Sequence, residues 1–247
     1  RVLEQTRNRI SDAGLSIYEL PVLPDIDRPE DLVMLGERKS DWTHPKPLIS
    51  VIVPTLNEEA VLPRTLESVC AGSHIELLVA DGGSEDRTAK IAERAGARVL
   101  RVEGGRAVQQ NRAAAEARGR LLLFCHADTR LPTRYDDLVR QTLDRPDVAA
   151  GAFRFAPDGA GPVMRLIEWG ANARSRLARL PYGDQGLFLT AYCFEREGGF
   201  PPMPIMEDFA LVDRLRRRGR VCTLDTPAVT SARRWVELGP VRTFWQN

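Results

Sequence analysis

The sequence lacks the features that mark several classes of protein. No apolar run approaches the ~18 residues that a membrane helix needs, and the longest, residues 121–125, has the length of a strand. The first residues are charged and polar, unlike a secretory signal. The four cysteines are scattered without a CxxC pair, which argues against a zinc site and a disulfide framework. These absences favour a cytoplasmic protein with reduced thiols.

A strong basic excess is also missing. The chain has 35 Lys and Arg residues against 34 Asp and Glu, a net charge of +1, whereas nucleic-acid-binding domains usually show a clear positive balance. We therefore expect no nucleic-acid partner. Lysine is scarce, since it occurs only at positions 39, 46 and 90. Arginine supplies the other basic groups and suits bidentate contacts with phosphate or carboxylate, although the base composition of a genome produces the same bias.

The usual nucleotide-binding loops are absent as well. No GxGxxG follows the first predicted strand and no GxxxxGK[ST] occurs anywhere, which argues against a dinucleotide fold and a P-loop. Gly104–Arg106 precedes a predicted helix. Such a turn places backbone N–H groups where they can hold a phosphate, but a simple glycine-rich turn has the same sequence.

What is present is an alternation of strands and helices from residue 48 onward. With 247 residues, 43% of them hydrophobic, the chain can form one large domain or one domain plus an appendage. The predicted strands are 48–53, 75–80, 97–102, 121–125, 148–155, 187–190, 221–224 and 229–232. The predicted helices are 57–71, 85–95, 105–118, 132–143, 164–180 and 207–218. Strands that are apolar on both faces predict a doubly wound, mainly parallel α/β sheet with helices on both sides.

The proline-punctuated residues 1–47 differ in character from the rest. We predict an N-terminal extension at 1–47 and a main domain at 48–247. In open α/β sheets, ligands bind at the carboxyl ends of the strands. Polar segments follow three of the predicted strands directly, at 54–59, 81–86 and 126–129. For Asp81 and Asp128 we favour a functional role, whereas Asn57 and Ser84 are typical helix caps.

Taken together, these segments resemble family 2 glycosyltransferases of the GT-A fold. The matching segments are PTLNEE at 54–59, DGGSEDRT at 81–88, GRA at 105–107 with Gln110 and Asn111, and HADT at 126–129. The resemblance spans about 48–235. Segments YGDQGLF (182–188) and PIMEDF (204–209) are similar to a bacterial subgroup associated with selenium or arsenosugar gene neighbourhoods. Residues 1–40, and 20–32 most clearly, resemble the tail of a nucleotidyltransferase-like GT-A domain, so we expect that the natural chain is longer or has lost an upstream domain.

The resemblance implies a metal-dependent, inverting transferase that moves a sugar from a UDP- or GDP-sugar to a hydroxyl group of a small-molecule or lipid-linked acceptor. The implied donor-binding residues are Thr55, Asn57, Glu58, Asp81, Arg106, His126 and Asp128. Asp128 is also the implied ligand of Mg²⁺ or Mn²⁺. Asp208 is the implied general base, with Glu207 beside it. The implied contacts to the acceptor or pyrophosphate are Asp184, Gln185, Arg234 and Trp235.

Elementary chemistry supports such a set. A divalent ion stabilises a leaving diphosphate and needs few protein carboxylates, and a placed carboxylate can take the proton of the attacking hydroxyl. The chain departs from the family where His126 replaces the first acid of Asp-x-Asp and Ser231 replaces a glutamine of processive members. His126 is also typical of a structural histidine, and Glu207 and Asp208 of first-turn helix acids.

Two other functions compete with this interpretation. One is a nucleotidyltransferase that makes a sugar nucleotide, and the other is a noncatalytic nucleotide-binding module. A nucleotidyltransferase would need a glycine-rich loop with Lys or Arg after the first strand, which 54–58 lacks. For the location we expect the cytoplasm, with peripheral attachment to a membrane through the arginines of 165–179 as an alternative.

Overall fold

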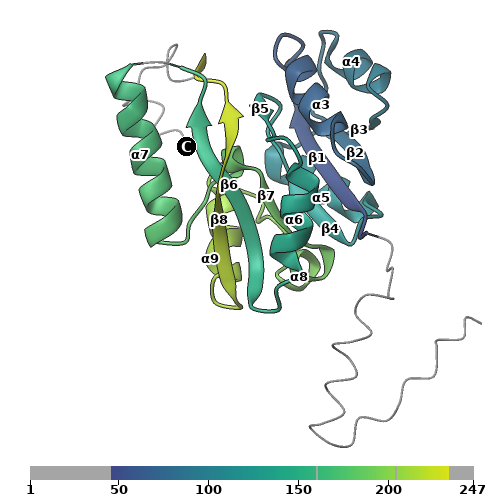
Figure 1. Ribbon diagram of the computed structural model, residues 1–247. Helices are drawn as coiled ribbons and strands as arrows, with labels where there is room; N and C mark the ends of the chain where they lie inside the picture. The colour runs from purple at the N-terminus through teal and green to yellow at the C-terminus, as the bar shows by residue number, and fades with distance from the viewer. Residues whose placement is uncertain (1–45, 160, 204, 234–247) are drawn as a thin grey trace, which may run out of the picture. The chain divides into compact units, whose positions relative to one another are not determined.

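The computed structural model describes residues 46–159, 161–203 and 205–233 (Figure 1). The strands are β1 (Ile49–Thr55), β2 (Ile75–Asp81), β3 (Arg98–Arg101), β4 (Leu121–Phe124), β5 (Thr129–Arg130), β6 (Val148–Pro157), β7 (Leu187–Thr190) and β8 (Arg220–Thr230). The helices are α3 (Leu62–Cys70), α4 (Thr88–Arg94), α5 (Arg106–Glu116), α6 (Tyr135–Leu143), α7 (Pro162–Leu177), α8 (Ala191–Arg196) and α9 (Glu207–Leu215), with a 3₁₀ turn, η3 (Gly183–Gln185). The predicted N-terminal extension lies, apart from its last two residues, outside the described residues, as do Arg234 and Trp235.

The strands form one sheet in the order β3-β2-β1-β4-β7-β6-β8-β5. The first four run parallel to one another. Strand β7 is antiparallel to β4 and β6, β6 runs parallel to β8, and the short β5 pairs antiparallel with β8. All residues of β1 and β4 are buried, as expected for strands covered on both faces. The predicted α/β fold with a mainly parallel sheet is confirmed.

The apolar core lies on both faces of this sheet because successive strand residues point to opposite sides. Val51 and Leu123 pack on one face with residues of α3, α4 and α6. Ile52 and Phe124 pack on the other with residues of α5, α8 and α9. Gly151 of β6 leaves room for the ring of Phe188, which a Cβ atom there would meet at 2.3 Å. The sandwich holds the carboxyl ends of β1, β2 and β4 side by side at one edge.

Several boundary predictions were wrong. Helix α3 begins at Leu62 rather than just after Asn57, and α4 begins at Thr88 rather than at residue 85. Neither Asn57 nor Ser84 caps a helix, because each is hydrogen-bonded between loops instead. The two strands predicted at 221–224 and 229–232 are one continuous strand, β8, which runs beside β6 with irregular register. The short β5, η3 and α8 were not predicted at all.

Candidate active site

Asp81, at the end of β2, is the centre of the first half of the site. Its carboxylate is fully buried. One oxygen, Oδ1, accepts from the hydroxyls of Thr55 (3.3 Å) and Ser84 (2.5 Å), and Oδ2 accepts from the backbone N–H groups of Gly83 (3.3 Å) and Ser84 (3.0 Å). A carboxylate has about four acceptor positions, and protein donors fill all four. Asp81 therefore shapes the loop after β2 from within.

The loop after β1 is clasped to the loop after β2. Asn57, in the left-handed region at φ 54°, accepts a hydrogen bond from the N–H of Glu85 at 2.9 Å and donates its own N–H to Ser84 Oγ at 2.9 Å. The N–H of Glu58 donates to Thr88 Oγ1 at 2.8 Å. A surface ion pair between Glu59 and Arg87 closes the outer side at 3.0 Å. Residues 54–59 and 81–88, two of the motifs on which the family resemblance rests, are thus hydrogen-bonded to each other.

Helix α5 is hydrogen-bonded to the ends of β1 and β2, from which the two clasped loops start. The side chain of Gln109 donates to the carbonyl oxygens of Thr55 (2.9 Å) and Ala80 (2.8 Å), the backbone of both strand ends. Gly82 sits against this amide, because a Cβ atom at that position would lie 2.9 Å from Gln109 Nε2. Gln109 therefore ties the ends of β1 and β2 to α5.

Asp208, in the first turn of α9, is the centre of the second half. Its side chain is 9% exposed. Its Oδ2 accepts from the N–H of Gly183 at 2.5 Å, and Oδ1 accepts from the N–H of Phe209 at 2.7 Å. His126, after β4, lies against the same turn, since a Cβ atom on Gly183 would be 2.8 Å from His126 Nε2 and 3.3 Å from Asp208 Oδ2. Residues remote in sequence therefore meet at Gly183.

Burial and charge raise the pKa of both acids at this turn. The pKa of Asp208 lies above its ordinary value because of desolvation and the neighbouring Glu207, against the opposing Gly183 N–H and Arg106. Desolvation, with the charges of Asp208 and Asp128, raises the pKa of Asp184 to about 7. Asp184 Oδ1 is buried and has no hydrogen-bond partner among the described residues. An unpartnered acid beside two others is suited to receive a proton or a cation.

Arg106 and Glu207 form an ion pair between the first turns of α5 and α9. The Glu207 side chain is 2% exposed and that of Arg106 is 30% exposed. Burial alone would lower the pKa of Arg106, but the hydrogen bond and charge of Glu207, with Asp208 and Asp184, raise it. Glu207 Oε2 is buried and lacks a hydrogen-bond partner in the described part of the chain. The pair thus joins the turn after β3 to the acids of α9.

The end of β8 connects the two halves. Thr230 Oγ1 donates to the carbonyl oxygen of Asp184 at 2.8 Å, and the N–H of Ser231 donates to the carbonyl oxygen of Asp128 at 3.1 Å. Arg233 Nη2 then pairs with Glu58 Oε2 at 2.9 Å. Sequence reasoning pointed to Arg234 and Trp235 and missed Arg233. Nothing in the sequence signalled the pairing of Arg233 with Glu58, and Arg234 and Trp235 lie outside the described residues.

Gln185 holds the turn that carries Asp184. It is fully buried. Its Oε1 accepts from Ser175 Oγ of α7 at 2.7 Å and from the N–H of Tyr182 at 3.0 Å, and its Nε2 donates to the carbonyl oxygen of Phe153 at 3.0 Å. The guanidinium of Arg174 stacks on the Tyr182 ring at 3.4 Å. The predicted acceptor contact of Gln185 stays a prediction, and its hydrogen bonds give it a positioning role.

The residues predicted from the sequence thus fall into two groups. The first group belongs to the clasped loops and consists of Thr55, Asn57, Glu58 and Asp81. The second group lies in or around the Gly183 turn and consists of Arg106, His126, Asp184, Gln185, Glu207 and Asp208. Asp128 interacts electrostatically with Asp184 and its backbone holds Ser231. In the described ranges, no group of three or more His, Cys, Asp or Glu side chains is arranged as a complete metal site.

The pKa of Asp184 predicts a pH-dependent effect on stability. The folded protein holds the proton up to pH about 7, whereas an unfolded aspartate loses it near pH 4. Stability therefore falls as pH rises from about 4 to about 7. We expect Asp184→Asn to raise the melting temperature relative to wild type progressively across this window, measured by thermal unfolding without added metal. Exposed Asp144→Asn is the control and should show a flat difference; a flat difference for Asp184→Asn would contradict this environment.

Comparisons with known proteins identify the family of the chain. The model of Glycosyl transferase family 2 matches residues 50–196. The chain is 36% identical over 156 residues to the undecaprenyl-phosphate 4-deoxy-4-formamido-L-arabinose transferase of Pseudomonas aeruginosa, covering 57% of this chain and 46% of that protein. It is 41% identical over 120 residues to an uncharacterized protein of Mycobacterium tuberculosis, covering 45% of this chain and 36% of the other. The chain spans less than half the length of these relatives.

Solved structures share the fold. The mannosyltransferase PcManGT of Pyrobaculum calidifontis, in complex with GDP-Man and Mn²⁺, superposes with a TM-score of 0.62 at 22% identity, covering 80% of this chain and 63% of its own. S. aureus TarS 1-349 in complex with UDP gives a TM-score of 0.62 at 18% identity, covering 74% and 60%. Since the family model matches more than half of the residues, this chain belongs to glycosyl transferase family 2.

Proposed function

We propose that the chain is an inverting glycosyltransferase that moves a sugar from a nucleotide-sugar donor to a hydroxyl acceptor. One observation carries the proposal: the Gly183 turn brings the predicted base, Asp208, against His126 of the motif after β4. Asp184 and the Arg106–Glu207 pair surround the same turn. Family membership supplies the reaction class, and this cluster supplies a place for it.

The clasped loops are the proposed binding site of the nucleoside. Thr55 and Asp81 would form the base of this site, and Glu58, which pairs with Arg233, would face the ribose. UDP and GDP are the donor nucleotides we propose, because solved relatives of this fold are complexes with UDP, UDP-GlcNAc and GDP-Man. The acceptor is a small molecule or a lipid-linked sugar; one relative is named an undecaprenyl-phosphate 4-deoxy-4-formamido-L-arabinose transferase. The selenium- or arsenosugar-associated subgroup and a cytoplasmic location remain sequence-based predictions.

The proposed mechanism is a single displacement. Asp208 would accept the proton of the attacking hydroxyl, since its two oxygens are fixed by backbone N–H groups and its raised pKa favours proton uptake. Arg106 would lie near the diphosphate and oppose its charge. Holding donor and acceptor in line against this rigid frame would supply much of the remaining acceleration.

Asp128 and Asp184 could hold a divalent ion if the phosphate oxygens of the substrate supply further ligands. The charge of Asp128 helps to raise the pKa of Asp184, and Asp184 Oδ1 is buried without a hydrogen-bond partner in the described ranges. Mg²⁺ or Mn²⁺ typically takes one or two carboxylates and completes its shell with phosphate oxygens and water. Asp128 would be the main ligand, and the ion would neutralise charge on the leaving diphosphate. His126 as a further ligand would favour Mn²⁺.

Neither competing function gains support from the site. The segment after β1 is held in the clasp by its backbone and by Asn57, and it contains no glycine-rich loop with Lys or Arg. A noncatalytic module would not need a buried, fixed carboxylate such as Asp208 beside an unpartnered Asp184.

Nucleotide binding is the first test of the proposal. We expect UDP or GDP with Mn²⁺, at about 100 times Kd, to raise the melting temperature by about 5–11 °C. Asp128→Asn should remove the Mn²⁺-dependent part of this shift, and exposed Asp144→Asn should keep it. Thermal unfolding with each nucleotide and sugar nucleotide, with and without Mn²⁺, measures both. No stabilisation by any of them would refute the proposal.

A further inference from the structure

Helix α7 presents a row of apolar side chains to solvent. Leu166 is 67% exposed, Trp169 70% and Leu177 87%. These positions, with Val163 and Ala173, recur every three or four residues and therefore lie on one side of the helix. We call these five residues the α7 face. A water-facing helix side normally carries polar groups, so this composition indicates a surface that is covered in use.

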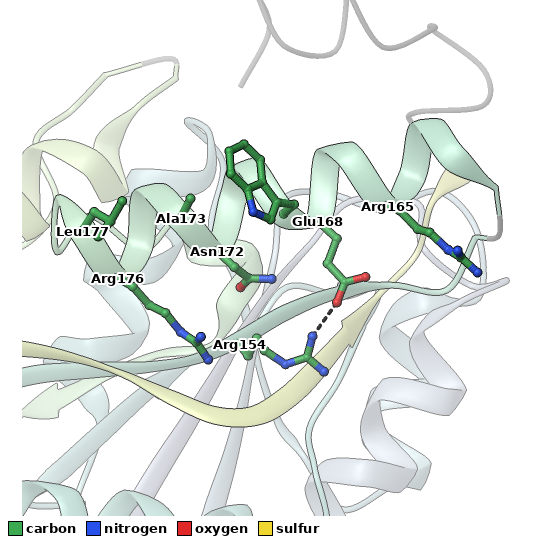
Figure 2. Close-up of a pocket in the computed structure, with 8 residues that line it drawn as sticks. Arg154, Arg165, Glu168, Asn172, Ala173, Arg176 and Leu177 are labelled. Carbon is green, nitrogen blue, oxygen red and sulfur yellow. Dashed lines mark hydrogen bonds and ion pairs between the residues drawn. The ribbon is translucent and has the colours of Figure 1, made fainter.

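Positive charge lies directly beside this face. A cavity of about 450 Å³ runs along α7 beside Arg154 of β6, and it is lined by Arg154, Arg165, Glu168, Trp169, Asn172, Ala173, Arg176 and Leu177 (Figure 2). Glu168 pairs with Arg154, and Asp225 pairs with Arg176. Arg165 makes no ion pair with any residue that the structure describes. In Figure 2, Leu177 and Ala173 lie on the side of α7 away from the strands, while Arg176 extends toward them.

We propose that the α7 face and its flanking arginines dock onto the surface of a membrane that contains anionic phospholipids. A helix with apolar residues, including Trp, on one side and Arg at the border lies in the interface plane with its apolar side among the acyl chains. Arginines at that border reach phosphate groups while their stems stay in the apolar layer. The α7 face has this arrangement in a single helix.

The helix lies on the membrane rather than crossing it. Helix α7 has 16 residues, about 24 Å of helix, which is shorter than the ~30 Å apolar layer of a bilayer. Within the described residues, no helix is long and apolar enough to span a membrane. In Figure 1, α7 stands at the outer side of the sheet beside β6 and β8.

Charge and size favour lipid over a second copy of the chain. Two α7 faces packed against each other would bring Arg165 and Arg176 of both copies together, whereas anionic headgroups complement them. A standard protein interface uses about 20–30 residues a side, and the α7 face offers five. Insertion into a fluid surface needs no matching partner shape and suits a narrow apolar row.

Docking at α7 would also place the site close to the membrane. Ser175 of α7 donates to Gln185, which holds the turn of Asp184, and Arg174 of α7 stacks on Tyr182. The proposal stands on the α7 surface alone and does not depend on the proposed glycosyl transfer.

Sedimentation with phospholipid vesicles tests the proposal. We expect the full chain to bind phosphatidylcholine vesicles that contain phosphatidylglycerol, and to bind pure phosphatidylcholine vesicles much less. Trp169→Glu and Leu177→Glu should each lower the partition coefficient by at least about tenfold, and Arg165→Glu should weaken binding and its salt dependence. Tyr192→Glu, at a residue 68% exposed on α8, is the matched control and should bind as wild type.

Each other outcome has a distinct meaning. No binding to anionic vesicles at low salt, or equal binding by all variants, overturns the proposal. Loss of a dimer in Trp169→Glu, seen by light scattering without any change in vesicle binding, would make the α7 face an interface between copies. A lower melting temperature for Trp169→Glu than for Tyr192→Glu would show that another segment of the chain covers the face, which also overturns the proposal.

Discussion

Replacing Asp208 by asparagine should lower the turnover number by about 10²–10⁴-fold while nucleotide binding persists. The variant keeps the shape of the side chain but cannot accept the proton of the attacking hydroxyl. The turnover number of the wild type should fall toward acidic pH. The apparent pKa of this fall should lie above the ordinary aspartate value of about 3.9, because burial raises the pKa of Asp208. Initial rates against pH, once a donor and an acceptor are identified, measure both effects.

The control for this variant lies on the same helix. Asp213 pairs with Arg216 and Arg217 at the surface of α9, and Asp213→Asn should keep full activity. Because asparagine places an NH₂ group where Asp208 accepts from Gly183 or Phe209, some stability is lost as well, so thermal unfolding is recorded for every variant. If Asp208→Asn folds and transfers sugar at the wild-type rate, Asp208 is not the general base.

Removing Arg106 should be the most destabilising single change at the site. Glu207 is almost completely buried and Arg106 neutralises it. Loss of one partner of a buried pair leaves an uncompensated charge and costs about 3–5 kcal/mol. Arg106→Met should therefore lower the melting temperature by about 6–20 °C, measured by calorimetry. The double variant Arg106→Met/Glu207→Gln should regain much of the loss, since the orphaned charge is gone.

Arg112 provides the comparison on the same helix. It pairs with Glu116 one turn away, with 62% of its side chain exposed, and such surface pairs contribute only about 0.3–0.5 kcal/mol. Arg112→Met should therefore change the melting temperature little. Arg106→Met could unfold at the same temperature as Arg112→Met, or the double variant could be no more stable than Arg106→Met alone. Either result would show that Arg106 does not neutralise the buried charge of Glu207.

The regular part of the fold could be predicted because its signal is local. Buried strands such as 49–55 and 121–124 are continuous apolar runs, and their alternation with amphipathic helices indicates a parallel sheet. The helix starts were mispredicted because Asn57 and Ser84 are good caps in isolation, while the loop opposite offered each a different partner. Strand β8 was split in two by Asp225–Pro227, a turn-like sequence that pairing with β6 holds extended.

The site could be predicted as a set of residues but not as an arrangement. The motifs pointed to Asp81, Asp128 and Asp208 without indicating that Thr55 and the loop after β2 already fill the acceptor positions of Asp81. Nothing in the sequence indicated that Gly183 contacts both His126 and Asp208, because these contacts join segments that are far apart along the chain. The role of Arg233 depends on where β8 ends, which is also a tertiary property.

The clasp between the loops after β1 and β2 has a consequence for engineering. Asn57, Ser84 and Thr88 each accept a hydrogen bond from a backbone N–H group of the opposite loop, so the two segments share part of their hydrogen bonding. A chimera that takes only one of the two segments from a relative would leave hydrogen-bond donors and acceptors of that segment without their partners in the other segment. Exchange of nucleotide preference among such proteins would have to transplant 54–59 and 81–88 together, as one cassette.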